Sequence, residues 1–134
     1  MHVVAVSEAE TEGFGADLWK TVSAPCLVTL RAPLGTGKTA LARGLIRAAG
    51  HEGEVPSPTF AIVQPYETDP PLYHLDLYRL SSPAELHELG LEDMLDRGVV
   101  LVEWPEHGEG VLPPADLAVT GTTRADGARV WEAS

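Results

Sequence analysis

The sequence is poor in the features that mark secreted and membrane proteins. Cysteine occurs once among 134 residues, at Cys26, so no disulfide can form within the chain. No apolar run approaches the roughly 18 residues that indicate a membrane-spanning helix, and no signal peptide opens the sequence. These absences predict a cytoplasmic protein without a membrane partner, in which Cys26 is a reduced core residue of a buried strand.

Positive charge is also scarce. Lysine and arginine together number nine against 20 aspartates and glutamates, which leaves a net charge of -11 and a pI near 4.7. A protein that grips nucleic acid by itself carries a basic stripe or patch, whereas the few arginines here are scattered. Acidity of this kind mainly serves solubility. The length is typical of one domain, and we expect a single domain over residues 1–134.

One eight-residue segment points to a specific chemistry. Residues 32–39 read Ala-Pro-Leu-Gly-Thr-Gly-Lys-Thr, which is a G-x-x-x-x-G-K-T pattern with Ala32 in place of the first glycine. A short β-prone run at 26–30 precedes it and helical spacing over 40–46 follows, which is the strand–loop–helix context of a phosphate-binding loop. The inward-pointing amides of such a loop and the helix N-terminus together attract phosphate.

This loop predicts a nucleotide site that includes a metal ion. Lys38 is placed to reach the β- and γ-phosphates, and the Thr39 hydroxyl to bind Mg²⁺. We expect Ala32 to adjust the loop and leave binding intact, because the later glycines approach the phosphates most closely. The residues expected to contact the nucleotide here are Gly35, Thr36, Gly37, Lys38, Thr39 and Ala40.

The rest of the chain has the pattern of a layered α/β domain. The run at 60–66 is joined to the run at 72–78 by a short proline-containing link, which predicts an antiparallel pair. The fold expected is a three-layer sandwich of the P-loop NTPase type, with a mixed parallel and antiparallel central sheet flanked by helices and a ligand site at the carboxyl ends of the strands. Besides 26–30, strands are predicted at 2–6, 60–66, 72–78, 99–102, 116–121 and 128–132.

Helix boundaries are indicated by capping residues. Ser7 and Ser82 are each followed three residues later by glutamate, which is a capping-box pattern. The first predicts a helix through about Lys20, and the second a helix that ends near Gly90. Residues 92–96 are predicted to add a further turn or two.

An acidic and an aromatic residue follow the buried run at 99–102. Glu103 stands where a P-loop enzyme holds Mg²⁺ across from the loop hydroxyl. The ring of Trp104 could stack on a nucleobase, or it could only cover the edge of the sheet.

Two further segments carry polar groups that suit phosphoryl transfer. In the alternating run from 74 to 79, His74, Asp76 and Tyr78 share one face of a strand. Asp76 could bind metal through water or orient the attacking water, and the alternative is a solvent-facing strand with a local Asp–Arg pair. Thr59, in a stiff proline loop, could sense the γ-phosphate, or the loop could be an ordinary turn.

Taken in order, these segments resemble the bacterial TsaE (YjeE) family. The phosphate loop is followed by Ser57-Pro58-Thr59-Phe60, His74-Leu75-Asp76-Leu77-Tyr78-Arg79 and Val102-Glu103-Trp104-Pro105-Glu106, and the resemblance runs over nearly the whole chain. It implies an ATPase of tRNA threonylcarbamoyladenosine (t⁶A) biosynthesis that binds ATP and Mg²⁺. It also implies partners of the TsaB and TsaD type and slow hydrolysis without them.

The resemblance also implies catalytic roles for individual residues. Lys38 corresponds to the phosphate-binding lysine, and Thr39 and Glu103 to the metal-binding pair. Thr59 corresponds to a switch-type threonine and Asp76 to a carboxylate needed for hydrolysis.

Three more residues are implied to contact the nucleotide itself. Trp104 corresponds to an indole that stacks on adenine, and Glu8 and Thr11 to an opening segment that approaches the nucleotide. Family members often have threonine where this chain has Ala40, which removes one possible hydroxyl contact. Because the chain is acidic, we expect tRNA to be contacted mainly through the partner proteins.

Two other functions fit the phosphate loop. A small-molecule kinase would need an arginine-bearing lid and an acceptor pocket, for which the sequence offers no insertion. A non-hydrolytic module would use bound nucleotide only to control docking. A GTPase is disfavoured, because neither Lys20 nor Lys38 stands in an Asn-Lys-x-Asp context.

Overall fold

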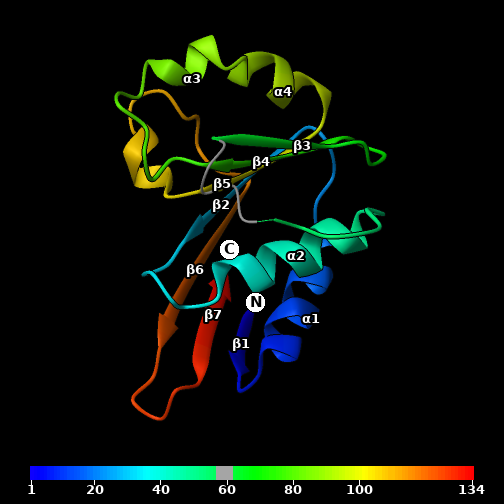
Figure 1. The fold of residues 1–134 in the computed structure, drawn as a ribbon, viewed down its shortest axis with the longest axis vertical. Helices are drawn as coiled ribbons and strands as arrows, with labels where there is room; N and C mark the ends of the chain where they lie inside the picture. The colour runs from blue at the N-terminus through cyan, green and yellow to red at the C-terminus, as the bar shows by residue number, and fades with distance from the viewer. Residues whose placement is uncertain (57–61) are drawn as a thin grey trace.

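A computed structural model describes residues 1–56 and 62–134 and contains one sheet. The sheet has seven strands in the order β1-β7-β6-β2-β5-β4-β3 (Figure 1). The strands are β1 (His2–Ala5), β2 (Cys26–Arg31), β3 (Val63–Tyr66), β4 (Leu72–Asp76), β5 (Val99–Glu103), β6 (Leu117–Thr123) and β7 (Arg129–Ala133).

The directions of the strands are mixed, as predicted. The four central strands β6, β2, β5 and β4 are parallel to one another. The outer pairs β3–β4, β6–β7 and β1–β7 are antiparallel. Since parallel neighbours end at the same edge, β2, β4 and β5 deliver their carboxyl ends side by side.

Helices cover both faces of the sheet. Figure 1 shows α1 (Glu8–Trp19) and α2 (Lys38–Ala48) on one side, and α3 (Glu85–Glu88) and α4 (Leu91–Arg97) on the other. Alternate residues of β5 enter the two cores: Leu101 packs in the core under α1 and α2, and Val102 in the core under α3 and α4. All five residues of β5 are buried, as its continuous apolar run requires. The three-layer α/β sandwich is therefore confirmed.

The predicted cap at Ser7 is confirmed, whereas Ser82 does not cap a helix: the N-cap of α3 is Ala84, without a side-chain cap. The Ser7 hydroxyl accepts a hydrogen bond from the Glu10 amide at 3.1 Å, and α1 follows. The Ser82 hydroxyl accepts from the amide of Ala84 at 3.2 Å, but α3 covers only four residues. Gly90 then adopts a φ of 84°, which separates α3 from α4.

The strands differ from the prediction mainly at their ends. β4 stops at Asp76, two residues earlier than expected, although the Leu77 amide still donates to the Glu103 carbonyl of β5. The antiparallel pairing of β3 with β4 is confirmed, and so are the two closing strands. In the part of the chain that the structure describes, no helix is long and apolar enough to cross a membrane.

Two glycines let α1 and α2 pack closely. A Cβ atom added at Gly44 of α2 would lie 2.0 Å from the carbonyl oxygen of Glu12, and one added at Gly15 of α1 would lie 2.1 Å from that of Leu41. These helix backbones therefore touch directly. Gly13, on an open part of α1, has nothing within 4 Å of the same position.

This contact predicts opposite effects for two Gly→Ala substitutions. Gly44→Ala should lower the free energy of unfolding by about 1–3 kcal/mol, because the added methyl group forces α1 and α2 apart. Gly13→Ala is the matched control, and should raise it by up to about 1 kcal/mol through helix propensity alone. Urea unfolding of both variants measures the difference. Equal effects would contradict the close contact.

Candidate functional site

The segment between β2 and α2 forms a loop at the carboxyl edge of the sheet. Gly35 and Gly37 adopt positive φ values of 80° and 107°, a backbone conformation that favours glycine. Ala32, in the position of the missing first glycine, is buried. Thr36 is also buried, while Thr39 is half-buried in the first turn of α2.

The ammonium group of Lys38 is enclosed by the loop and by β5. Its Nζ atom donates to the Ala32 carbonyl at 2.7 Å and lies 3.7 Å from the centroid of the Trp104 ring, which is a cation–π contact. Burial lowers the pKa of Lys38, and the negative charges of Glu103, Asp76 and Glu106 oppose that shift. Three carboxylates therefore lie close enough to act on this ammonium.

A buried histidine holds one of these carboxylates. The Nε2 atom of His74 lies 2.6 Å from Oε2 of Glu103, and neither side chain is more than 6% exposed. A carboxylate accepts, so Nε2 carries the proton and donates. Asp76 pairs with Glu103 in the β4–β5 register, which puts the three polar side chains on one face. The predicted alternative of a solvent-facing strand is thus wrong for His74.

Asp76 and Trp104, which both act on Lys38, have further partners of their own. Asp76 accepts a hydrogen bond from the Tyr78 amide at 2.9 Å through Oδ1. Trp104 has a left-handed backbone with φ 57° and stacks in a cluster with Tyr78 and His107, at ring-centroid distances of 5.0 Å and 5.7 Å. The indole therefore borders the lysine and is also half-buried against the core under α3 and α4.

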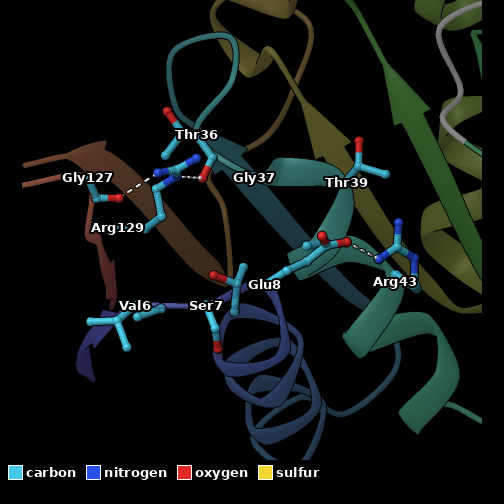
Figure 2. A pocket seen from close by; sticks show the side chains of 12 residues that line it. Val6, Ser7, Glu8, Thr36, Gly37, Thr39, Arg43, Gly127 and Arg129 are labelled. Carbon is cyan, nitrogen blue, oxygen red and sulfur yellow. Dashed lines mark hydrogen bonds and ion pairs between the residues drawn. The ribbon is translucent and has the colours of Figure 1, made fainter.

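A pocket of about 360 Å³ lies between the β1–α1 junction and the phosphate-type loop (Figure 2). The predicted residues Glu8 and Thr11 line it from α1. Of the six loop residues predicted to contact the nucleotide, four line this pocket, namely Thr36, Gly37, Thr39 and Ala40, whereas Gly35 and Lys38 do not. Trp104 does not line this pocket.

Two arginines of this pocket were not predicted. Arg43 of α2 bridges two carboxylates of α1, with its Nη1 atom 2.7 Å from both Glu8 and Glu12, and these bonds raise the pKa of Arg43. Arg129, at the start of β7, donates to carbonyls of the loop. The spacing of Arg43 after the loop could have suggested a contact with the site, but nothing local in sequence indicates Arg129.

The position of Thr11 depends on the same strand as Arg129. The indole Nε1 of Trp131 in β7 lies 3.4 Å from the Thr11 hydroxyl, and both side chains are buried. β7 therefore supports the pocket and the loop together.

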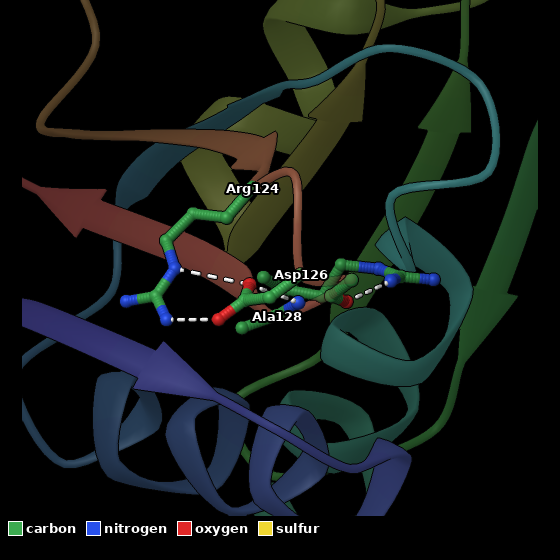
Figure 3. A network of polar contacts seen from close by, with 5 residues as sticks. Arg124, Asp126 and Ala128 are labelled. Carbon is green, nitrogen blue, oxygen red and sulfur yellow. Dashed lines mark hydrogen bonds and ion pairs between the residues drawn. The ribbon is translucent and has the colours of Figure 1, made fainter.

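The turn before β7 is held by a polar network (Figure 3). The Asp126 carboxylate accepts two hydrogen bonds from the Arg124 guanidinium and one from the Ala128 amide at 3.1 Å. Gly127 has a φ of 89°, which lets the chain reverse there. The hydrogen bond from Arg124, with the bond from Ala128, lowers the pKa of Asp126 to about 2.

The expected metal ligands have suitable chemistry. The Thr39 hydroxyl and the Glu103 carboxylate are hard oxygen donors of the kind that Mg²⁺ prefers. Within 1–56 and 62–134, no cluster of three His, Cys, Asp or Glu side chains could hold a metal by itself. A metal here would therefore need ligands from the nucleotide or water as well.

Thr59, the predicted switch-type threonine, lies outside the described residues.

A mixed sheet with a glycine loop between its central strand and a helix defines the P-loop NTPase-like class of fold. Within that class, the family model described as "Threonylcarbamoyl adenosine biosynthesis protein TsaE" matches residues 5–130, and the chain belongs to this family.

Individual relatives agree with this membership. The tRNA threonylcarbamoyladenosine biosynthesis protein TsaE of Haemophilus influenzae is 44% identical over 95 residues, which cover 69% of this chain and 60% of that protein. The protein of the same description from Rickettsia bellii is 41% identical over 109 residues, or 80% and 76% of the two chains. The crystal structure of Bacillus subtilis YdiB superposes with a TM-score of 0.83 at 28% identity, over 98% of this chain and 82% of that one.

The His74–Glu103 pair predicts a graded loss of stability. His74→Leu leaves a buried carboxylate without its donor and should lower the free energy of unfolding by about 1–3 kcal/mol. His74→Gln retains an N–H donor and should cost less. Urea unfolding at neutral pH compares the two variants, and equal losses would indicate that the hydrogen bond contributes nothing.

The Asp126 network predicts a pH dependence at the β6–β7 turn. The folded pKa of about 2 lies below the ordinary value of 3.8, so the contribution to stability is full above pH 3.8 and is lost as pH falls through 2. A carbon-13 NMR titration of the Asp126 carboxyl should give the lowered midpoint. Arg124→Gln should move that midpoint back toward 3.8, and an unshifted midpoint in the unaltered chain would contradict the network.

Proposed function

We propose that the chain is the ATP-binding and ATP-hydrolysing component of a system that makes t⁶A on tRNA. Membership of the TsaE family and the names of its relatives support the pathway. The observation that carries the ATPase assignment is the loop with Lys38 buried among Asp76, Glu103 and Glu106 at the carboxyl edge of the sheet. A triphosphate could take the place of the Ala32 carbonyl as the acceptor for the Lys38 ammonium.

In the proposed binding mode, the phosphates lie on the loop and the base enters the pocket beside Glu8 and Thr11. This pocket adjoins Thr36, Gly37 and Thr39, so one nucleotide can reach both parts. Trp104 contacts Lys38 and has no part in the pocket. We therefore assign Trp104 to the phosphate end of the nucleotide, in place of the adenine stacking expected from the resemblance.

Hydrolysis needs a metal ion and an oriented water molecule. Mg²⁺ would be held by Thr39 and Glu103, and would neutralise charge on the phosphates. Glu103 is kept in place by His74, and Asp76 lies beside it in register, where its carboxylate can orient water toward the γ-phosphate. We assign sensing of the γ-phosphate to Thr59, on the family resemblance alone.

Contact with tRNA is assigned mainly to proteins of the TsaB and TsaD type. The net charge of -11 opposes binding of a polyanion. Arg43, Arg97 and Arg124 are paired with carboxylates within the chain, and Arg129 is bonded to carbonyl groups. These four side chains have little capacity left for phosphates of RNA.

Two substitutions separate ATP binding from hydrolysis. Lys38→Ala should weaken Mg-ATP binding about tenfold or more, because a charge-assisted contact is lost. Asp76→Asn should keep binding but slow phosphate release about 10²-fold or more. Calorimetry and phosphate release, measured with and without co-purified partners, test both, and Lys20→Ala at the exposed end of α1 is the matched lysine control.

Other outcomes would reject parts of this proposal. Transfer of labelled phosphate to a metabolite would indicate a kinase. Unchanged hydrolysis in the Asp76→Asn variant, with loss of t⁶A formation, would favour the nucleotide-gated module. Tight tRNA binding by the isolated chain at physiological salt would contradict the assignment of RNA contact to partners.

A further inference from the structure

One guanidinium group contacts the outer side of the phosphate-type loop. Arg129 donates from Nε to the Thr36 carbonyl at 2.8 Å and from Nη2 to the Gly35 carbonyl at 3.2 Å. Its Nη1 atom donates to the Gly127 carbonyl at 2.6 Å. Figure 2 shows this side chain between the turn before β7 and the loop, which are 93 residues apart in sequence.

These bonds orient the peptide groups of the loop. In a trans peptide the carbonyl and the following N–H point to opposite sides of the chain. Because the Thr36 carbonyl is turned toward Arg129, the Gly37 N–H on the same peptide plane is turned away from it. The φ of 107° at Gly37 follows directly after that plane. A loop that binds phosphate needs its N–H groups turned inward in this way.

Strand pairing and a hydrogen-bonded turn hold the backbone of Arg129 in place. It pairs with Thr123 in the β6–β7 register, and the turn between them is closed by Arg124, Asp126 and Ala128 (Figure 3). The bond to the Gly127 carbonyl fixes the guanidinium against its own turn. The side chain is therefore set before a ligand arrives, which reduces the entropic cost of forming the loop.

The contacts of Arg129 are hydrogen bonds that join the turn before β7 to the loop. A guanidinium presents several donors in a planar fork, and here each of three nitrogen atoms meets a carbonyl. Within residues 1–56 and 62–134, no carboxylate forms a salt bridge with Arg129. Lys38 holds the same loop from inside through the Ala32 carbonyl.

We propose that Arg129 is a positioning residue, which keeps the phosphate loop in its anion-binding conformation by holding the Gly35 and Thr36 carbonyls outward. This inference rests on the proposed ATP site. It assigns part of the preorganisation of the loop to a side chain of β7. Arg129 also lines the pocket assigned to the base, but it braces the loop, so ligands that carry phosphates should depend on it much more strongly than a nucleoside does.

The test compares ATP with adenosine on the full chain by calorimetry in Mg²⁺ buffer. Arg129→Met, which keeps the length but removes the donors, should weaken ATP binding about tenfold, the effect of losing charge-assisted hydrogen bonds. Adenosine binding should change less than about twofold. Arg129→Lys keeps the charge without the fork and should recover only part of the ATP affinity. Arg97→Met on α4 is the matched control and should leave both affinities unchanged.

A readout without ligand separates positioning from direct contact with phosphate. In the nitrogen-15 NMR spectrum of the ligand-free chain, Arg129→Met should shift the amide signals of Gly35 and Gly37, and Arg97→Met should not. Full recovery of ATP affinity in Arg129→Lys, or equal losses for ATP and adenosine, would overturn the proposal. Failure of the unaltered chain to bind ATP would instead reject the proposed function.

Discussion

The parallel pairing of β4, β5 and β2 is the constraint on which the site depends. It brings Asp76, Glu103 and the start of the phosphate loop to one edge, although more than 60 residues separate β2 from β5. Burying Lys38 at that edge removes water from an ammonium group, which is unfavourable unless other groups replace it. The Ala32 carbonyl, the Trp104 ring and nearby carboxylates provide that replacement. A phosphate group would therefore meet an ammonium group whose loss of water is already offset by neighbouring protein groups.

Sequence alone predicted the layered fold and most of its elements, because the signals are local. The strand–loop–helix pattern around the loop and the Ser7 cap each depend on residues a few positions apart. The contacts that could not be predicted join distant segments. Arg129 reaches the loop across 93 residues, and Gly44 meets Glu12 only because two helices cross. The position of Trp104 directly after β5 is visible in the sequence, but its contact with Lys38 required the fold.

In this acidic chain, two of the few arginines bond to groups of the protein itself. Arg43 ties α2 to α1, and Arg129 ties β7 to the loop. Both side chains face the pocket that we assign to the nucleotide. In this chain the guanidinium groups of Arg43 and Arg129 therefore stabilise the walls of the pocket, which in the proposed binding mode leaves the phosphate contacts to the loop amides and Lys38. The shape of such a pocket is therefore maintained by a small number of arginines, each of which makes several hydrogen bonds.

The place of β7 between β1 and β6 has a consequence for synthesis of the protein. This strand carries Arg129 and Trp131, which support the loop and Thr11, and it also pairs with the first strand. A chain emerging from the ribosome has made the phosphate loop long before these residues exist. Until they leave the exit tunnel, the loop lacks its outer support and β1 lacks its neighbour. If the proposed ATP site is correct, nucleotide affinity should therefore be acquired only after β7 has entered the sheet.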